Sequence, residues 1–273
     1  MSDTYLTPFT AYLNRTNEKK LFDRWFRDHF DLFQASLIKD RAVRILDLGC
    51  GEGTTARLLF QALADRGQTF IYTGVEPSAQ QISRFRDNLE PVWQPSVRLA
   101  QSAFEDYATQ QPFDLVIAYH SLYYAPDLTA AIRRLLSLAP EVIIGHHGFR
   151  GINEIQLACR QHVIATNNII STDVDVEQVL LKLNQAGELG RRECERYSFT
   201  ATIHFRDLRH EEWHHLTAFF LNRASATVTA DMRELVGDFI EDHCSSPRYE
   251  LAHDVAISII TDRHIPSTRR HPV

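Results

Sequence analysis

The stretch Ile45-Leu46-Asp47-Leu48-Gly49-Cys50-Gly51-Glu52-Gly53 decides the fold. The apolar run 42–48 ends in three closely spaced glycines, and apolar residues at helical spacing follow at once in 54–64. A short apolar run that ends at glycine is typical of a buried strand. Glycine is needed where the backbone φ is positive and where a ligand must lie against bare backbone. The stretch therefore predicts a strand, a ligand-binding turn and a helix.

Beyond this turn, strand and helix patterns alternate along the chain. The expected strands are 42–48, 70–75, 97–100, 113–119, 142–145, 194–205 and 251–261, and the expected helices are 54–64, 79–89, 128–138, 152–164, 174–186 and an interrupted 211–244. This order predicts an α/β fold of the doubly wound class, in which a mostly parallel seven-stranded sheet carries helices on both faces.

We expect one main domain with additions at its ends. Residues 1–40 contain two amphipathic helical stretches, which we expect to form an N-terminal helical cap over the substrate site. Residues 41–262 are the predicted cofactor-binding domain, with a helical insertion at about 206–248 before the last strand. Residues 263–273 are basic and contain prolines, which favours a disordered tail.

Composition and charge argue against several classes of protein. Apolar residues make up 44% of the 273 residues, and the formal net charge is −6, which does not suit a nucleic-acid-binding surface. No run approaches the roughly 18 apolar residues of a membrane helix. The N-terminal segment lacks the basic start and apolar run of a signal peptide. We therefore expect a cytoplasmic protein that binds neither membranes nor nucleic acid.

Neither the cysteines nor the histidines indicate a metal site. None of Cys50, Cys159, Cys194 and Cys244 forms a CxxC pair, so we expect reduced thiols. Two adjacent histidine pairs occur, His146-His147 and His214-His215. Neighbours on a strand or a helix point in different directions, and such pairs rarely bind one ion. The second pair is typical of a solvated surface, whereas the first ends the fifth strand and is a candidate for lining a pocket.

Two features of the glycine turn distinguish between cofactors. The glycines run GxGxG instead of GxGxxG, which disfavours a nicotinamide dinucleotide, and Asp47 precedes Gly49 by two residues. A cofactor without a pyrophosphate does not need the third glycine of the dinucleotide pattern. Glu76 ends the second strand, 23 residues after Gly53, where a carboxylate can accept both ribose hydroxyls. The combination resembles motif I of the class I S-adenosyl-L-methionine (SAM)-dependent methyltransferases.

The other cofactor contacts follow from the expected strand order. Residues 102–106 follow the third strand, where such folds contact the adenine, and Ser102 is the candidate; an exposed loop is an equal alternative. The switch point of the sheet lies between the first and fourth strands, so Tyr119, His120 and Ser121 should border the methionine end of the cofactor.

Three longer strings extend the likeness. They are Tyr5-Leu-Thr-Pro-Phe9-Thr-Ala-Tyr12-Leu13-Asn14-Arg-Thr-Asn-Glu18, Val75-Glu76-Pro77-Ser78-Ala79-Gln80-Gln81-Ile82, and Phe113-Asp114-Leu-Val-Ile to Leu122-Tyr123-Tyr124. With them the chain resembles the histamine N-methyltransferase family over about residues 5–262. The resemblance implies a monomer that converts SAM to S-adenosyl-L-homocysteine (SAH) and methylates a small molecule.

The resemblance also implies roles for individual residues. Gly49, Glu76 and Gln81 would bind SAM, with Asp47, Gly51 and Gly53 of the same turn, and Tyr119 would flank it. On the substrate side, Glu18 matches the family's substrate-binding glutamate, and Tyr5, Phe9 and Tyr124 match the aromatic wall of its amine pocket.

Three departures from the family lie on the substrate side. His120 stands where the family has a glutamine, Asp254 (next to His253) where it has an asparagine, and Arg223 where it has an acid. These departures argue against histamine itself. An arginine in place of an acid would suit a substrate that bears a carboxylate.

We expect Glu18 to steer an amine by charge-assisted hydrogen bonding. His120, with an unperturbed pKa of about 6.5, would orient the substrate or accept its proton. Plainer interpretations exist for each residue: the spacing of Tyr5, Phe9 and Tyr12 is also that of a helix packed on a core, and a glutamate on a helix is usually solvated.

Three functions fit these residues. The first is methylation of a nitrogen in an imidazole- or amine-containing metabolite. The second is small-molecule O-methylation on the same scaffold, because the fold does not decide the acceptor atom. The third is a protein that binds SAM without transferring its methyl group, such as a natural-product cyclase.

Overall fold

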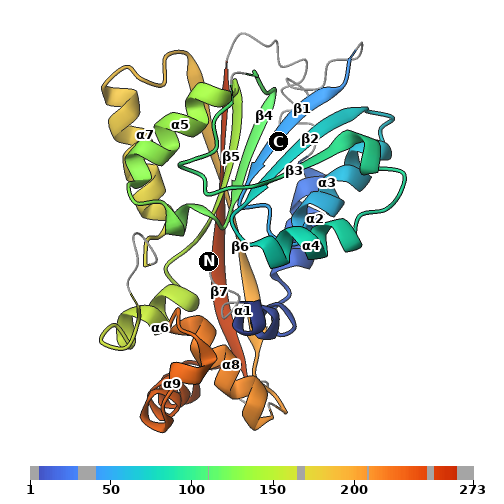
Figure 1. The fold of residues 1–273 in the computed structure, drawn as a ribbon. Helices are drawn as coiled ribbons and strands as arrows, with labels where there is room; N and C mark the ends of the chain where they lie inside the picture. Colours follow the sequence, from blue (N-terminus) through green and yellow to red (C-terminus); the bar gives the residue numbers. More distant parts are fainter. Residues whose placement is uncertain are drawn as a thin grey trace.

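The computed structural model of the chain describes residues 6–29, 41–109, 111–164, 170–207, 209–244 and 249–262 (Figure 1). Its centre is one seven-stranded sheet in the order β3-β2-β1-β4-β5-β7-β6. The strands are β1 (Val43–Leu48), β2 (Phe70–Glu76), β3 (Val97–Gln101), β4 (Leu115–Tyr119), β5 (Glu141–His147), β6 (Arg192–His204) and β7 (Glu250–Asp262).

The sheet is mixed. Strands β1 to β5 pair in parallel, as predicted. β7 pairs antiparallel with β5, and β6 pairs antiparallel with β7. All seven predicted strands are therefore present. The prediction did not specify the two antiparallel pairs, which lie at one edge of the sheet.

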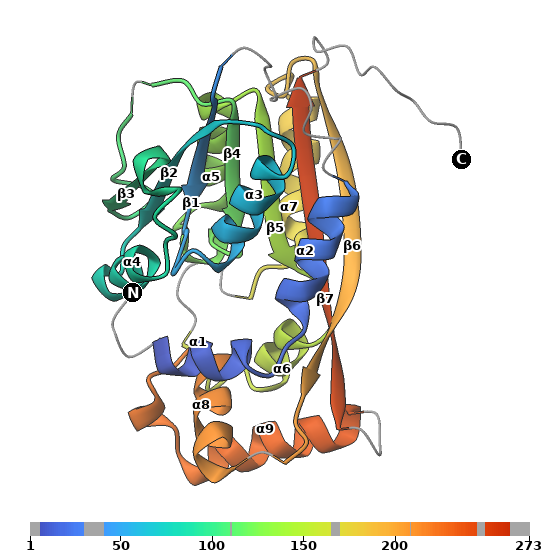
Figure 2. The ribbon, with the colours of Figure 1, turned by 90° about the vertical axis from the view of Figure 1, so that its right-hand side faces the viewer.

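Helices cover both faces of the sheet, as expected of a doubly wound fold (Figures 1 and 2). One face packs against α2 (Glu18–Asp28), α3 (Thr54–Ala64) and α4 (Ala79–Asp87). The other face packs against α5 (Leu128–Leu138) and α7 (Asp173–Gln185). Both layers bury apolar side chains that recur at helical spacing, and this burial is the main source of their stability.

A third apolar cluster lies beyond the carboxyl ends of the parallel strands. It joins α1 (Leu6–Leu13), α6 (Ile152–Ala158), α8 (His210–Phe220) and α9 (Ala230–His243) (Figure 2). β5 ends opposite Val255, whereas β6 and β7 stay paired as far as His204 and Glu250. The extended β6–β7 ribbon thus carries these helices past the edge of the sheet, and a space remains between the two parts.

The N-terminal segment is fastened to this ribbon. Thr16 forms an isolated bridge with Ile203, and the Asn17 side chain accepts a hydrogen bond of 2.8 Å from the backbone N–H of Thr202. The pairing holds the start of α2 next to the space between the sheet and the third cluster.

The helices α1 and α2 lie within the predicted cap, and α8 and α9 lie within the predicted insertion. The expected tail, 263–273, lies outside the described residues.

Within the described ranges, no helix is both long enough and apolar enough to cross a lipid bilayer.

Candidate active site

The glycine turn after β1 leaves its backbone bare toward a cavity. Gly49, Gly51 and Gly53 all have positive φ, at 78°, 56° and 78°. A Cβ atom on Gly49 would lie 2.4 Å from the Cβ of Ser121, and one on Gly51 would lie 2.8 Å from the Oε1 of Gln81. Glycine is therefore required at both positions, because φ is positive and because a Cβ atom has no room, as the sequence predicts.

Glu76 ends β2 beside this turn. Its Oε2 accepts a hydrogen bond of 3.2 Å from the N–H of Gly51, and its Oε1 accepts one of 2.9 Å from the N–H of Ser78. Burial raises the pKa of Glu76, and these backbone N–H groups lower it, so that a net rise remains. A buried carboxylate here is well placed to accept hydrogen bonds from a ribose.

Two adjoining hollows meet at the carboxyl ends of β1, β2 and β4. Both are lined by Gly49, Glu76, Ser121, Tyr124 and Asn222. The one that we call the main cavity is also lined by Phe9, Tyr12, Leu13, Glu18, Lys19, Cys50, Gly51, Glu52, Thr54, Thr55, Gln81, Tyr119, His120, Tyr123, His147, Ile152, Gln156 and Phe219. The one that we call the side groove is also lined by Leu48, Val75, Pro77, Ser102, Ala103, Phe104, Glu105, Leu122, Ala125, Ile164, Arg223 and Ala224.

Glu18 is the most enclosed charged group of the main cavity, with 1% of its surface exposed. Its Oε2 accepts a hydrogen bond of 2.6 Å from the hydroxyl of Tyr12, and its Oε1 accepts one of 3.2 Å from the hydroxyl of Tyr119. Burial by itself raises the pKa of Glu18, but the neighbouring His120 and Lys19 outweigh it and hold the pKa well below its usual value. The site thus holds a buried, ionised carboxylate.

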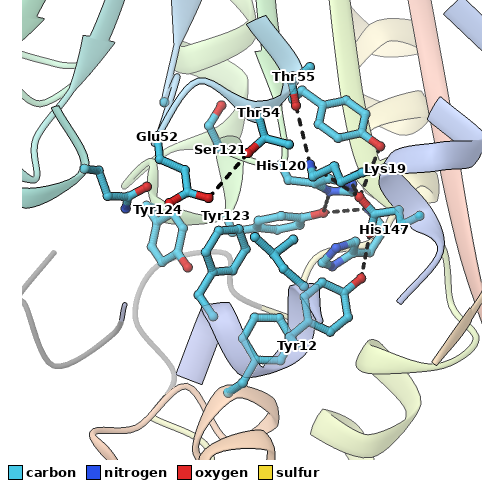
Figure 3. Close-up of a pocket in the computed structure, with 18 of the residues that line it drawn as sticks. Tyr12, Lys19, Glu52, Thr54, Thr55, His120, Ser121, Tyr123, Tyr124 and His147 are labelled. Atoms are coloured by element: carbon cyan, nitrogen blue, oxygen red, sulfur yellow. Dashed lines mark hydrogen bonds and ion pairs between the residues drawn. The ribbon is translucent and has the colours of Figure 1, made fainter. Parts of the chain in front are cut away.

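Two histidines approach this carboxylate. The Nε2 atom of His120 lies 3.1 Å from Glu18 Oε1, and the Nε2 atom of His253 lies 3.4 Å from Glu18 Oε2. The Nδ1 atom of His120 shares a hydrogen bond of 2.9 Å with the hydroxyl of Tyr123 (Figure 3). His147 adds a third imidazole, whose ring centre is 4.2 Å from that of His120.

His120 has an unusual backbone conformation for its residue type. Its φ is +55°, in the left-handed region that favours glycine. The conformation follows directly after β4, where the His120 N–H donates a hydrogen bond of 3.0 Å to Gly145 of the neighbouring strand β5. Strain of this kind, held in place by the surrounding sheet, is common where a side chain must be aimed at a functional site.

The part of the chain that contains Glu18, the glycine turn, Glu76 and His120 matches a known type of domain. Residues 16–146 match the family model described as a methyltransferase domain. The chain is a SAM-dependent methyltransferase. SAM is its cofactor, and the site fits it: the bare glycine backbone, the Glu76 carboxylate and a buried Ser121 hydroxyl without a hydrogen-bond partner among the described residues all face the same hollows.

Solved structures share the fold of this methyltransferase at low sequence identity. A SAM-dependent methyltransferase from Thiobacillus denitrificans, in complex with SAH, is 15% identical, with 96% of this chain and 99% of that chain covered and a TM-score of 0.54. A candidate methyltransferase from Bacillus halodurans is 15% identical, with 85% and 97% covered and a TM-score of 0.58. The YcgJ protein from Bacillus subtilis is 15% identical, with 86% and 99% covered and a TM-score of 0.52.

No curated protein shows significant sequence similarity to the methyltransferase. The closer likeness to the histamine N-methyltransferase family therefore stays a prediction, and so does the nature of the acceptor.

The expected cofactor residues occupy different positions around the hollows. Gly49, Gly51, Glu76, Gln81 and Tyr119 line the main cavity, and Ser102 lines the side groove. Two others do not line either hollow. A Cβ atom on Gly53 would meet the ring of Phe85 at 2.7 Å, and Asp47 lies beneath the turn, where it accepts a hydrogen bond of 2.6 Å from the hydroxyl of Tyr72.

Four of the expected substrate residues, Phe9, Glu18, His120 and Tyr124, line the main cavity of the methyltransferase. Phe9 and Tyr12 pack near Phe219 of α8, and the rings of Tyr12 and Phe219 stack at 4.3 Å between centres. Tyr5 lies outside the described residues.

Three expectations for the substrate side need correction. His146 is buried, and its Nε2 shares a hydrogen bond of 2.8 Å with the hydroxyl of Ser171. Its neighbour His147 lines the cavity. Asp254 accepts two hydrogen bonds of 2.8 Å from the guanidinium group of Arg150 and lines neither hollow. In both cases the strand turns neighbouring side chains to opposite faces. Of the pair at the end of β5 only His147 faces the cavity, and the resemblance pointed to Asp254 where its neighbour His253 faces Glu18.

The third correction concerns Arg223. It lines the side groove, together with Ser102 and Glu76, and its Nε donates a hydrogen bond to the backbone oxygen of His162. Its position does not support a contact with a carboxylate of a substrate bound beside Glu18.

The sequence analysis assigned no role to several groups that the structure brings to Glu18. Lys19 follows Glu18, and its Nζ lies 3.6 Å from Glu18 Oε1 and 4.4 Å from the ring centre of Tyr119. His147 was a candidate only as one of the pair His146-His147, and His253 was visible only as the neighbour of Asp254. The one usable signal was strand alternation, which requires the register of β5 against β7 before it can be applied.

Proposed function

We propose that this methyltransferase transfers the methyl group of SAM to a nitrogen of a small molecule that contains an imidazole or an amine. The observation that carries the proposal is the Glu18 carboxylate, 1% exposed and held in an aromatic-lined cavity that opens onto the cofactor turn. A buried negative charge close to the reaction centre favours acceptors with positive or hydrogen-bond-donating nitrogen groups.

The aromatic wall supports the same acceptor class. Phe9, Tyr12, Tyr124 and Phe219 line the cavity with Glu18. Aromatic faces attract cations, and they also pack well against a flat heterocycle. Together with one carboxylate, they would hold a small nitrogenous molecule by one end and leave the other end toward the glycine turn.

The surroundings of Glu18 keep the carboxylate in one orientation. Tyr12 donates to one of its oxygens and Tyr119 to the other. Tyr119 ends β4 at the switch point of the sheet, so the same side chain touches the acceptor end and borders the cofactor end of the cavity. Such a link would hold the acceptor at a fixed distance from the methyl group, which is the main contribution an enzyme makes to an in-line displacement.

Bound SAM supplies the electrophilic methyl group, and the acceptor nitrogen must present a neutral lone pair to it. His120 lines the cavity next to Glu18, so its ring is placed to orient the acceptor or to receive the proton that the nitrogen loses. The buried side chains around Glu18 also exclude water from the reacting atoms.

The test is a mass-shift assay with purified protein, SAM and a panel of imidazoles, primary amines, amino acids and phenols. We expect one methylene to be gained by an imidazole or an amine, with release of SAH. A methylated phenol with no methylated nitrogen compound would overturn the proposal in favour of O-methylation. SAM that binds but is never consumed with any panel member would overturn it in favour of a binding role.

A further inference from the structure

We propose that Glu18, His120 and His147 form a binding site for a divalent transition-metal ion such as Zn²⁺. One carboxylate oxygen and one nitrogen from each imidazole all lie within 4.8 Å of one another. The inference goes beyond the proposed function, because it concerns an ion and can be tested without any methyl acceptor.

The three side chains converge from separate elements. Glu18 begins α2, His120 follows β4 and His147 ends β5, and all three line the main cavity. Figure 3 shows His120 and His147 together in this cavity. Zinc binds histidine nitrogen and carboxylate oxygen at about 2.0 to 2.2 Å, so two ligands at a tetrahedral ion lie about 3.4 Å apart. The separation of 3.1 Å between His120 Nε2 and Glu18 Oε1 is close to that value.

The nitrogen atoms that face Glu18 lack hydrogen bonds. His120 Nε2 and His253 Nε2 are buried and have no hydrogen-bond partner among the described residues, although each lies within 3.4 Å of a Glu18 oxygen. A nitrogen and an oxygen that both point at a third atom are expected to lie close together without the geometry of a hydrogen bond. Buried polar atoms without a hydrogen bond are costly, and an ion held beside Glu18 would satisfy the Nε2 atom of His120.

The groups behind two of the three ligands, His120 and Glu18, are those of a metal centre. Metal-binding histidines are usually held through their other ring nitrogen, and metal-binding carboxylates by hydrogen bonds. With Nε2 of His120 on an ion, its Nδ1–H would donate to the Tyr123 hydroxyl, 2.9 Å away. The hydroxyls of Tyr12 and Tyr119 orient the Glu18 carboxylate in the same way.

The donor set selects the class of ion. Two imidazole nitrogens and one carboxylate oxygen suit Zn²⁺, Fe²⁺, Co²⁺ or Ni²⁺, whereas Mg²⁺ and Ca²⁺ prefer oxygen alone. A site with three protein ligands leaves a coordination position open toward the cavity. An imidazole acceptor could use that position through one ring nitrogen while the other faces SAM. With the ion bound, His120 would orient the acceptor through the metal and would not receive its proton.

Lys19 is the competing cation. Its Nζ lies 3.6 Å from the same Glu18 oxygen that faces His120 and 3.5 Å from the Thr55 hydroxyl. An ion at Glu18 would be repelled by this ammonium group. The metal affinity should therefore rise when Lys19 is replaced by methionine, which keeps most of the length of the side chain and removes its charge.

The experiment uses tag-free protein stripped with a chelator, titrated with Zn²⁺ in a calorimeter and with Co²⁺ in a spectrophotometer. We expect one ion per chain and visible absorption of protein-bound Co²⁺. Glu18→Gln and His147→Ala should each weaken binding at least about 100-fold, and Lys19→Met should strengthen it. The double variant His214→Gln/His215→Gln, which removes a histidine pair outside the cavity, is the matched control and should bind as the unaltered protein does.

Retained SAH binding shows that each variant is folded, so a lost metal site cannot be confused with a lost fold. The proposal is overturned if no ion binds stoichiometrically, or if Glu18→Gln and His147→Ala bind metal as tightly as the unaltered protein. Because no acceptor is present, these results leave the proposed methyl transfer to stand or fall by its own assay.

Discussion

The two ends of the main cavity are built in opposite ways. Most of the cofactor end comes from residues 45–82, and much of what this stretch presents is backbone: the bare turn at Gly49 and Gly51, next to the carboxylate of Glu76. The acceptor end is made of side chains from α1, α2, α8 and the ends of β4 and β5. A backbone site depends on local conformation, whereas a side-chain site depends on the packing of the whole molecule.

The difference predicts which substitutions separate cofactor binding from acceptor binding. Changes at the glycine turn should weaken SAM binding and, because methyl transfer requires SAM, also lower turnover of the acceptor. Changes at Glu18 should spare SAM and remove the acceptor reaction. The predictions below test this division, from the largest expected effect to the smallest.

The largest effect is expected for Gly49→Ala. The added Cβ would meet Ser121 Cβ at 2.4 Å in a backbone conformation that L residues rarely adopt, so the turn must move. We expect SAM affinity to fall about 100-fold, from strain and a shifted turn worth roughly 1–3 kcal/mol. Equilibrium binding of SAM and SAH measures it.

Gly67→Ala is the matched control for Gly49→Ala. Gly67 also has a positive φ, +65°, but a Cβ there would meet nothing within 4 Å. We expect a loss of stability of about 1 kcal/mol and unchanged SAM affinity. Equal losses of SAM affinity in both variants would show that general destabilisation, and not the turn, is responsible.

The next effect is expected for Glu18→Gln, once an acceptor is known. The substitution removes the buried charge that the proposed acceptor needs, so kcat/KM for that acceptor should fall about 100-fold. SAH affinity should stay within about threefold, because Glu18 does not belong to the glycine turn. Steady-state kinetics and SAH titration of one protein sample compare the two.

Glu212→Gln controls for the loss of a glutamate near the N-terminal segment. Glu212 pairs with Arg15 at 2.7 Å on a partly exposed surface, and such pairs contribute little to stability. Normal kinetics are expected. If Glu18→Gln weakened SAH binding as strongly as it lowers acceptor turnover, the cofactor end and the acceptor end of the cavity would not act independently.

The smallest effect on ligand binding and turnover is expected for Asp47, whose substitution acts on the pH dependence of stability. Burial raises the pKa of Asp47 from 3.8 to about 6, against the opposing hydrogen bond from Tyr72. Between these values the unfolded chain has released the proton and the folded chain keeps it, so stability falls as pH rises from about 4 to about 6 and changes no further above that range. Asp47→Asn should remove this decline and be up to about 3 kcal/mol more stable at neutral pH.

Denaturant unfolding of both proteins at about pH 4 and about pH 7 checks the sign. The gain should be present at the higher pH and absent at the lower one. A variant that is less stable than the unaltered protein at neutral pH would show that the ionised form of Asp47 is favoured by the fold. In that case the buried charge of Asp47 would not destabilise the folded protein.

The parts of the site that could be predicted from sequence are those encoded within a few neighbouring residues. Gly49 and Gly51 were recognisable because their spacing follows a buried strand, and Glu76 because it ends the next one. Glu18 and Phe9 were placed only through resemblance to a family, since a glutamate and an aromatic residue on a helix are otherwise unremarkable. His253 and Lys19 offered no local signal at all.

The sequence by itself determined the order of strands and helices, the doubly wound fold and the cofactor turn, because each depends on periodicity or on glycine conformation over a short range. Only the tertiary structure decided the acceptor end. The sequence indicated the pair His146-His147 without distinguishing its members, and it indicated Asp254, whereas His147 and His253 are the residues turned toward Glu18. Side chains on a strand alternate between faces, so which of two neighbours enters a cavity depends on the register of β5 against β7 and on the Asn17–Thr202 contact that holds Glu18 beside them.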